Sequence, residues 1–346
     1  MRAMVIKEFR QLRRDRRTLA LMIVIPLLLL VVFGYAARFD IKQVPTAIVG
    51  PGAETVAAGL PEPLDVVIID PTGNRASGED LLRRSRVMIA VVTGSPLTIL
   101  VDGSELFAAQ SVLRQTGNLP LVKPNIEVLF NPDLSTAVVM VPAIIGMVLT
   151  AVGSMITSLG VVRERQEGTL EQLAVMPLRP RDVIVGKVAP YFLVGVIDLV
   201  VITVAGLALF KVPFRGSVLV FAAGAFLFLL AVLGVGVLIS TVSKTQGEAI
   251  QLGIMTMLPQ VLLSGMIFPL TSMPWGIRWI SQLLPLTYFI QIVRGVFLKA
   301  TPLDALAIPF AALLALAVVV FGLAILRFRR DLTPARSRHR TAEVTP

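Results

Sequence analysis

Residues 217–242 read SVLVFAAGAFLFLLAVLGVGVLISTV, a run of 26 residues without a charged side chain. A helix of about 20 apolar residues is long enough to cross the hydrocarbon core of a bilayer. The whole chain of 346 residues is 55% hydrophobic, above the roughly 45–50% that is usual for soluble domains, and its mean hydropathy is +0.82. The sequence therefore predicts a polytopic α-helical membrane protein.

Five further apolar runs predict a total of six transmembrane helices. They are Thr18–Ala36, Ala137–Val162, Val183–Phe210, Ala249–Leu270 and Ala305–Leu326. The first run could instead be a signal peptide, because Gly34-Tyr35-Ala36 resembles a small-x-small cleavage site. It is longer than the usual apolar segment of about 7–15 residues in such peptides. We therefore interpret residues 18–36 as an uncleaved first transmembrane helix, followed by a five-helix transmembrane domain at 135–328.

The distribution of basic residues predicts the orientation. Seven of the 32 Lys and Arg residues lie in the first 17 positions, and six more follow between Arg327 and Arg340. Basic residues that flank membrane spans are enriched on the cytoplasmic side. The segments assigned to that side carry 19 Lys and Arg residues, whereas the short outer loops carry only Lys211, Arg215, Arg278, Arg294 and Lys299. We expect both termini to be cytoplasmic, with residues 329–346 as a cytoplasmic tail.

Residues 1–17 combine these cations with apolar residues at helical spacing, namely Val5, Ile6, Phe9 and Leu12. Such a segment can lie in the membrane interface, with its apolar side chains toward the lipid. We expect a cytoplasmic interfacial helix here, and a merely charged flank is the alternative.

The composition also excludes several functions. The net charge is +10, but no basic patch interleaved with aromatic residues is present, so we expect no nucleic-acid partner. The chain has no cysteine, and His339 is its only histidine. A Ser/His/Asp arrangement and Cys- or His-based metal sites are therefore not expected. The sequence predicts neither catalytic residues nor a metal site.

Residues 37–134 differ from the rest of the chain, since they are polar and rich in Pro and Gly. Short strand-like runs occur at Val44–Val49, Val66–Ile69, Met88–Val92 and Thr98–Val101, separated by turn signals. We expect helices at 78–86 and 104–116. The segment is predicted to be a small α/β domain, and it is extracytoplasmic because the first span carries the chain out of the cytoplasm.

Residues 271–300 are apolar but broken by prolines, as in Met273-Pro274-Trp275 and Leu284-Pro285-Leu286. Non-helical backbone at membrane depth is tolerated only where protein or water satisfies it. We expect a re-entrant helical segment on the outer side.

The first inner loop, predicted at 163–182, begins RERQEGTLEQLAVMPL at residues 163–178. Thr169 and Gln172 have the spacing of a capping box, so Thr169 can cap a short helix. Pro177 and Pro180 would end that helix. A short rigid helix at this place would suit docking to a partner, and a solvated turn is an equally good alternative on these residues alone.

The same loop, with Gly186-Lys187 after it, resembles the corresponding loop of type-2 ABC exporter permeases, the membrane subunits of multidrug and lipid exporters. LSGMIFP at 263–269, LPLTY at 284–288 and Arg294-Gly295 resemble a second part of these permeases. The resemblance covers nearly the whole chain in order, and Gln166 departs from a position that is often charged in the family. It implies that a separate ATPase subunit docks on this loop, and that the loop couples ATP hydrolysis to transport. The implied docking positions are Arg163, Glu164, Arg165, Glu167, Gly168, Thr169, Leu170, Glu171, Gln172 and Leu173, and the outer segment would include Pro269, Met273, Pro274, Pro285 and Tyr288.

The resemblance further implies a pair of permease subunits, as two copies or as paralogues, in a bacterial cytoplasmic membrane. The chain has no G-x-x-x-x-G-K-[ST] motif, so the partner ATPase would bind ATP and Mg²⁺. We therefore expect no cofactor in this chain and no enzymatic activity of its own. The expected cargo is hydrophobic or amphiphilic, such as a drug, a lipid or a lipopeptide.

Asp198 lies near the middle of the third predicted span. An ionisable residue at that depth is costly, which makes it a candidate for function. It could contact substrate or a coupling proton, or it could face the helix bundle with a hydrogen-bonded neighbour. Two other functions remain as alternatives. A membrane-anchored receptor or scaffold would use the outer domain to bind a ligand, and a secondary transporter would be expected to show internal repeats.

Overall fold

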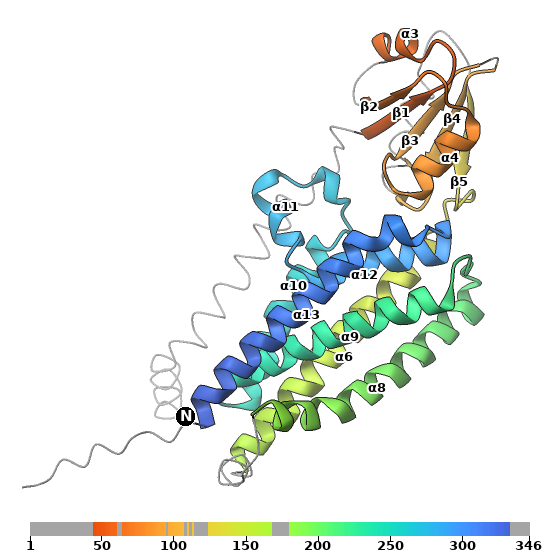
Figure 1. Ribbon diagram of the computed structural model, residues 1–346. Coiled ribbons are helices and arrows are strands. Elements are labelled where there is room, and N and C mark those ends of the chain that lie inside the picture. The colour runs from red at the N-terminus through yellow and green to blue at the C-terminus, as the bar shows by residue number, and fades with distance from the viewer. Residues whose placement is uncertain are drawn as a thin grey trace, which may run out of the picture.

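The computed structural model describes residues 44–60, 64–94, 96–106, 109–110, 113, 124–167 and 180–332. An α/β domain lies at one end of a bundle of long helices (Figure 1). The interfacial helix predicted at 1–17 and the first span at 18–36 lie outside the described residues, as do residues 333–346 of the tail predicted at 329–346.

The α/β domain is built on one mixed five-stranded sheet of order β2-β1-β3-β4-β5. β1 is parallel to β2 and β3, β4 is antiparallel to β3, and β5 is parallel to β4. The strands are β1 Val44–Val49, β2 Leu64–Asp70, β3 Ile89–Val92, β4 Thr98–Asp102 and β5 Asn125–Leu129. β1 has the bounds expected from the sequence, and the other three predicted strands differ by one or two residues at their ends. β5 was not predicted.

Apolar residues are buried on both faces of this sheet. On one face, Leu82 of α4 (Arg75–Arg83) packs with Ala47 and Leu100. On the other, Ala53 of α3 (Ala53–Ala58) packs with Ile48. Burial of both faces explains why β1 reads as a nearly continuous apolar run and not as an alternating one.

Helix α4 begins three residues earlier than the helix predicted at 78–86. The Asn74 side chain accepts a hydrogen bond from the Ser77 amide at 3.1 Å, and the Ser77 hydroxyl accepts one from the Asn74 amide at 3.3 Å. This reciprocal cap fixes the start of the helix. In the stretch predicted to be helical at 104–116, the described residues Leu106, Ala109, Gln110 and Leu113 are helical.

Five long helices form the bundle, and α9 lies between α6 and α13. They are α6 Thr136–Gln166, α8 Pro180–Phe210, α9 Val218–Val242, α10 Gln246–Leu263 and α13 Leu303–Leu332. Four short helices connect α10 to α13, namely η1 Leu270–Ser272, α11 Trp275–Ser281, α12 Pro285–Arg294 and η2 Gly295–Lys299. Phe228 of α9 stacks on Phe289 of α12 with ring centroids 4.2 Å apart, which seats α12 against the bundle.

Among the described residues, four helices are long and apolar enough to cross a membrane. They are Thr136–Gln166, Val188–Phe210, Val218–Val242 and Leu303–Arg327. A bent pair, Trp275–Ser281 with Pro285–Lys299, would bring the number to five if it is one broken span. The chain is thus polytopic, and the expectation of six spans stays a prediction.

The span predicted at Ala249–Leu270 differs most from the structure. α10 ends at Leu263, and Gly265 has a φ of 86°, a left-handed conformation that favours glycine and ends the helical path. α10 also carries Gln246, Glu248, Gln251 and Gln260, so it is not among the four apolar helices.

Close helix approach depends on a small residue where α9 crosses α6. A Cβ atom added at Gly236 would lie 2.7 Å from the Ser154 carbonyl oxygen and 2.9 Å from the Thr157 Cβ. Small residues allow helix backbones to approach closely within a membrane.

The α/β domain is fixed to the bundle by charged residues. The Lys299 ammonium contacts the Asp102 carboxylate at 2.5 Å and donates to the Ser85 hydroxyl at 2.8 Å. The Arg294 guanidinium donates to Glu105 at 2.8 Å. Lys299 is 4% exposed and Arg294 8% exposed. Both were counted from the sequence as cations of the short outer loops, whereas they lie in the helical path between α11 and α13 and are buried against acidic residues far away in the sequence.

Arg84 makes a more exposed link between the same parts. It donates hydrogen bonds to Asp304 of α13 and to Asp80, and these bonds raise the pKa of Arg84 above its ordinary value, with Asp304 contributing most.

We predict that Gly236→Ala destabilises the protein by about 1–3 kcal/mol, because the added methyl group meets backbone that cannot move aside. Gly322→Ala is the matched control, since no atom of the described part of the chain lies within 4 Å of a Cβ there. In a helix, that control should be neutral or stabilising by about 0.5–1 kcal/mol. Thermal unfolding in detergent measures both, and equal stability of the two variants would contradict the packing argument.

We also predict that Lys299→Met destabilises the protein by about 3–5 kcal/mol, because it leaves the Asp102 carboxylate buried without its cation. The double variant Lys299→Met, Asp102→Asn should recover part of the loss, since no unpaired charge remains. Arg84→Ala serves as a control, because solvent screens its partly exposed pair with Asp304 and the loss of stability should be much smaller. Denaturant or thermal unfolding of the four proteins decides between these values.

Candidate functional site

The predicted docking loop begins at the C-terminal end of α6, at the opposite end of the bundle from the α/β domain (Figure 1). Residues Arg163–Glu167, here called the α6 terminal segment, are the part of that loop which the structure describes before Pro180. The Arg163 Nε lies 2.9 Å from Glu167 Oε1, one turn apart, and both side chains are exposed. Glu164 and Arg165 are half-buried.

The α6 terminal segment is connected to the turn between α9 and α10. Arg165 Nη1 donates a hydrogen bond to the Ser243 carbonyl oxygen at 3.0 Å. Gln246 Nε2 donates to Gln166 Oε1 at 3.1 Å. These two bonds join residues that are about 80 positions apart in the sequence, and they connect the end of α6 to the turn that leads into α10.

The α9–α10 turn is itself well defined. The Thr245 hydroxyl accepts a hydrogen bond from the Glu248 amide at 3.2 Å, and Glu248 Oε2 accepts one from the Lys244 amide at 2.7 Å. The Ser243 hydroxyl donates to the Ile239 carbonyl oxygen at 2.8 Å. The turn is therefore a firm attachment point for the α6 terminal segment.

The remaining predicted docking positions are Gly168, Thr169, Leu170, Glu171, Gln172 and Leu173, which lie outside the described residues. The capping box of Thr169 and Gln172 and the docking role of the whole loop stay predictions.

Asp198 lies on α8 and is half-buried. Within the part of the chain that the structure describes, its carboxylate has no hydrogen bond or ion pair. Tyr191, two turns earlier on the same helix face, lies against Gly160 of α6. Asp198 therefore lies on the side of α8 that turns toward α6, and a hydrogen-bonded neighbour, one of the two expectations for it, is not found among the described residues.

The predicted outer segment is a helix pair with a bend of 78° between α11 and α12. Prolines begin its helices, since Pro274 immediately precedes α11 and Pro285 is the first residue of α12. The bend is fixed by Thr287, whose hydroxyl donates to the Ser281 carbonyl oxygen at 2.7 Å, and by Tyr288, whose hydroxyl donates to the Gln282 carbonyl oxygen at 2.8 Å.

The two other predicted positions of this segment lie on its α10 side. Met273 is buried, and its sulfur accepts a hydrogen bond from the Ser281 hydroxyl at 3.6 Å. Pro269 immediately precedes the short helix η1. Trp275 is 84% exposed and Trp279 50% exposed. Aromatic rings of this kind are enriched at the membrane–water interface.

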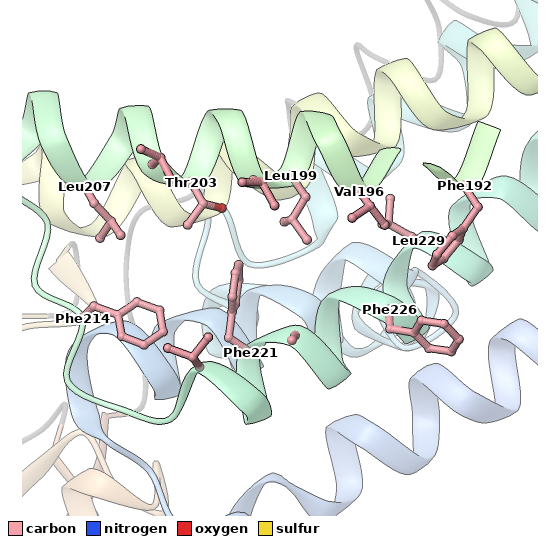
Figure 2. A pocket seen from close by; sticks show the side chains of 13 residues that line it. Phe192, Val196, Leu199, Thr203, Leu207, Phe214, Phe221, Phe226 and Leu229 are labelled. Atoms are coloured by element: carbon pink, nitrogen blue, oxygen red, sulfur yellow. The ribbon is translucent and has the colours of Figure 1, made fainter. Parts of the chain in front are cut away.

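An apolar cavity of about 520 Å³ lies between α8 and α9 (Figure 2). Phe192 and Phe226 bound one end, and Phe214 and Phe221 bound the other (Figure 2). Thr203 is its one polar lining residue, and its buried hydroxyl has no partner among the described residues. Asp198 does not line this cavity, so the structure does not bring the two candidate features together.

Ser243 and Gln246, which form hydrogen bonds with the α6 terminal segment, were not predicted from the sequence. One signal was available, because Thr245 and Glu248 have capping-box spacing and mark the start of α10. The long-range contacts themselves had no signal in a single sequence. Among the described residues, no group of three or more His, Cys, Asp or Glu could hold a metal ion.

Comparison with known proteins gives a consistent result. A family model described as "ABC-2 family transporter protein" matches residues 16–326. The chain is 29% identical to the protein named "Probable multidrug ABC transporter permease YbhS" of Escherichia coli K12, over 96% of this chain and 97% of that protein. It is 31% identical to "Inner membrane transport permease YhhJ" of the same organism, over 62% of this chain and 57% of that protein.

A eukaryotic relative matches over a smaller share of its own length. The chain is 27% identical to "ABC transporter G family member 20" of Dictyostelium discoideum, over 66% of this chain and 32% of that protein. The match to the family model covers the four long apolar helices, except Arg327 at the end of the last one, and the α6 terminal segment. The chain therefore belongs to the ABC-2 family of transporter proteins, as a membrane-spanning subunit of an ABC exporter.

Proposed function

We propose that this subunit exports a hydrophobic or amphiphilic compound, such as a drug, a lipid or a lipopeptide. The names of the similar Escherichia coli permeases support a multidrug cargo. A separate ATPase subunit binds ATP and Mg²⁺ and docks on residues 163–173, and this chain is not itself an enzyme. The observation that carries the proposal is the bond from Arg165 to Ser243, which links the docking loop to the transmembrane bundle.

The proposed coupling uses two rigid elements, the α6 terminal segment and helix α10. Closure of the ATPase subunits displaces the α6 terminal segment, and the bonds of Arg165 and Gln246 pass this displacement to α10. α10 leads at its other end, past Gly265, to the bent pair α11–α12. Nucleotide binding can thus bias a two-state element at the far side of the bundle.

We infer that the subunit works with a second copy or a paralogue in a bacterial cytoplasmic membrane. In this arrangement both termini face the cytoplasm and the α/β domain lies outside. The basic flanks of the first and last predicted spans support that orientation. A receptor or a secondary transporter is disfavoured, because neither explains membership of the ABC-2 family.

We predict that Arg165→Ala reduces ATPase stimulation by transport substrate at least tenfold, while the subunit still inserts and co-purifies with its ATPase. The reason is loss of the bond to Ser243 that transmits motion to α10. The measurement is the ATPase activity of the reconstituted complex with and without substrate. Arg327→Ala is the control, since Arg327 is an exposed cation at the same end of the bundle without an ion pair among the described residues.

Two results would contradict this proposal. Unchanged stimulation in Arg165→Ala would remove the link to α10 from the mechanism. Failure of the tagged wild-type chain to co-purify with any ATPase, even after gentle crosslinking, would remove the docking role of residues 163–173.

We infer further that Asp198 contacts a cationic or polar group of the cargo, because a carboxylate without a partner in the described bundle is costly at that depth. Asp198→Asn should lower transport of a cationic amphiphile about tenfold, since one charge-assisted contact is lost, and leave a neutral amphiphile of similar size unaffected. Transport into inverted vesicles measures both. Equal effects on the two compounds, or none on either, would leave Asp198 with a structural role only.

A further inference from the structure

A second cavity, of about 380 Å³, lies where the α/β domain meets the bundle. Its walls come from the end of α4, from α11 and α12, and from the first turns of α13, which lie together at this end of the molecule (Figure 1). The apolar cavity of Figure 2 is separate from it and is lined by other residues. The two cavities differ in chemistry, because this one is rich in cations and hydroxyl groups.

Four cations line the cavity, namely Arg84, Arg278, Arg294 and Lys299, together with a single acid, Glu105. Asp80, Asp102 and Asp304 neutralise Arg84 and Lys299, but these three carboxylates are not part of the lining. The charge that faces the cavity is therefore positive, although the cluster as a whole is close to neutral.

Arg278 differs from the other three cations. It is exposed, and its guanidinium has no ion pair or hydrogen-bonded partner among the described residues. It holds no part of the fold together, so its charge is available to a ligand.

Three buried polar atoms of lining residues have no hydrogen-bond partner in the described part of the chain. They are Arg294 Nε, Ser264 Oγ and Thr271 Oγ1. Ser264 is 1% exposed and Arg294 8% exposed. Buried polar groups are normally satisfied, so a cluster of three unsatisfied donors beside a cavity is unusual and favours an acceptor-rich occupant.

The remaining wall is apolar. Leu306, Ile308 and Pro309 of α13 contribute to it, with Leu270 and Ile290 opposite. Ile308 is 77% exposed and stands on the same helix as the exposed Leu314 and Val318, on a candidate membrane span. The apolar wall thus includes an exposed side chain of a helix that is long and apolar enough to cross a membrane.

We propose that this cavity binds a phosphate-bearing anion, the headgroup of an anionic phospholipid whose acyl chains lie along α13. Phosphate oxygens are strong acceptors for guanidinium and hydroxyl donors, and Arg matches their geometry. The site lies between the α/β domain and the bent pair, away from the α6 terminal segment. A bound headgroup would join Arg278 of α11 to the cations of α4 and α12. The proposal does not depend on the identity of the cargo or on ATPase coupling.

The test uses the full-length purified protein and dioctanoyl phosphatidylglycerol as the probe. Saturable binding is followed as an increase in melting temperature, because a ligand that binds only the folded state stabilises it. Arg278→Gln should raise the apparent dissociation constant about tenfold, the equivalent of one charge-assisted hydrogen bond. Lys211→Gln is the matched control, since Lys211 is an exposed cation in the α8–α9 turn, at the same end of the bundle, and does not line the cavity.

Two further binding measurements distinguish a lipid headgroup from free phosphate as the bound anion. Dioctanoyl phosphatidylcholine should bind at least tenfold more weakly, and inorganic phosphate should compete only weakly, because it lacks the acyl chains that contact α13. Equal binding of the two lipids, or an equal loss in Arg278→Gln and Lys211→Gln, would overturn the proposal. If inorganic phosphate binds as tightly as phosphatidylglycerol, the lipid assignment is wrong and the cavity is a site for free phosphate.

Discussion

The contact between Lys299 and Asp102 determines how the two parts of this protein fit together. Both side chains are nearly inaccessible to solvent, so neither charge is acceptable without the other. Asp102 ends the strand β4, and Lys299 ends the helical path α12–η2. The pair therefore fixes the central sheet to the helices that cap the bundle. A pair of this kind contributes more to the choice of one arrangement than to net stability, because removing two charges from water offsets most of their attraction.

Several neighbouring features depend on that position. The Lys299 ammonium also donates to the Leu82 carbonyl oxygen at the end of α4. After Lys299 the chain turns at Ala300, which has a φ of 49°, and then enters α13. The Arg294 guanidinium bridges Glu105 and the Gly265 carbonyl oxygen, so the break after α10 is held by the same group of residues. One region thus places the α/β domain, the bent pair and the start of α13 relative to each other.

The elements that can be predicted from the sequence are those for which a local residue pattern is itself the cause of the structure. The apolar run at 217–242 became α9 at Val218–Val242, and the strand at 44–49 was found at those residues. β5 was missed because its residues, Asn125–Leu129, include Asn and Glu, which are uncommon in strands. It is stabilised by its parallel pairing with β4, which no local pattern reveals. Long-range contacts were missed for the same reason. Arg294 and Lys299 read as loop cations, since their acids lie about 190 residues earlier.

The length of α6 has a mechanical consequence. Its 31 residues make it about 46 Å long at 1.5 Å per residue, whereas the hydrocarbon core of a bilayer is only about 30 Å thick. Part of the helix must therefore lie outside the hydrocarbon core, and it can act as a lever with its fulcrum at the close crossing of Gly236. Ser154 and Thr157, which meet Gly236, lie 12 and 9 residues before the end of α6 at Gln166, so the arm is roughly 14–18 Å long and a rotation of about 5° displaces its tip by about 1–2 Å. The displacement of the end of α6 therefore depends on the number of helical turns beyond the crossing. That number can change in evolution without altering the packing at the crossing.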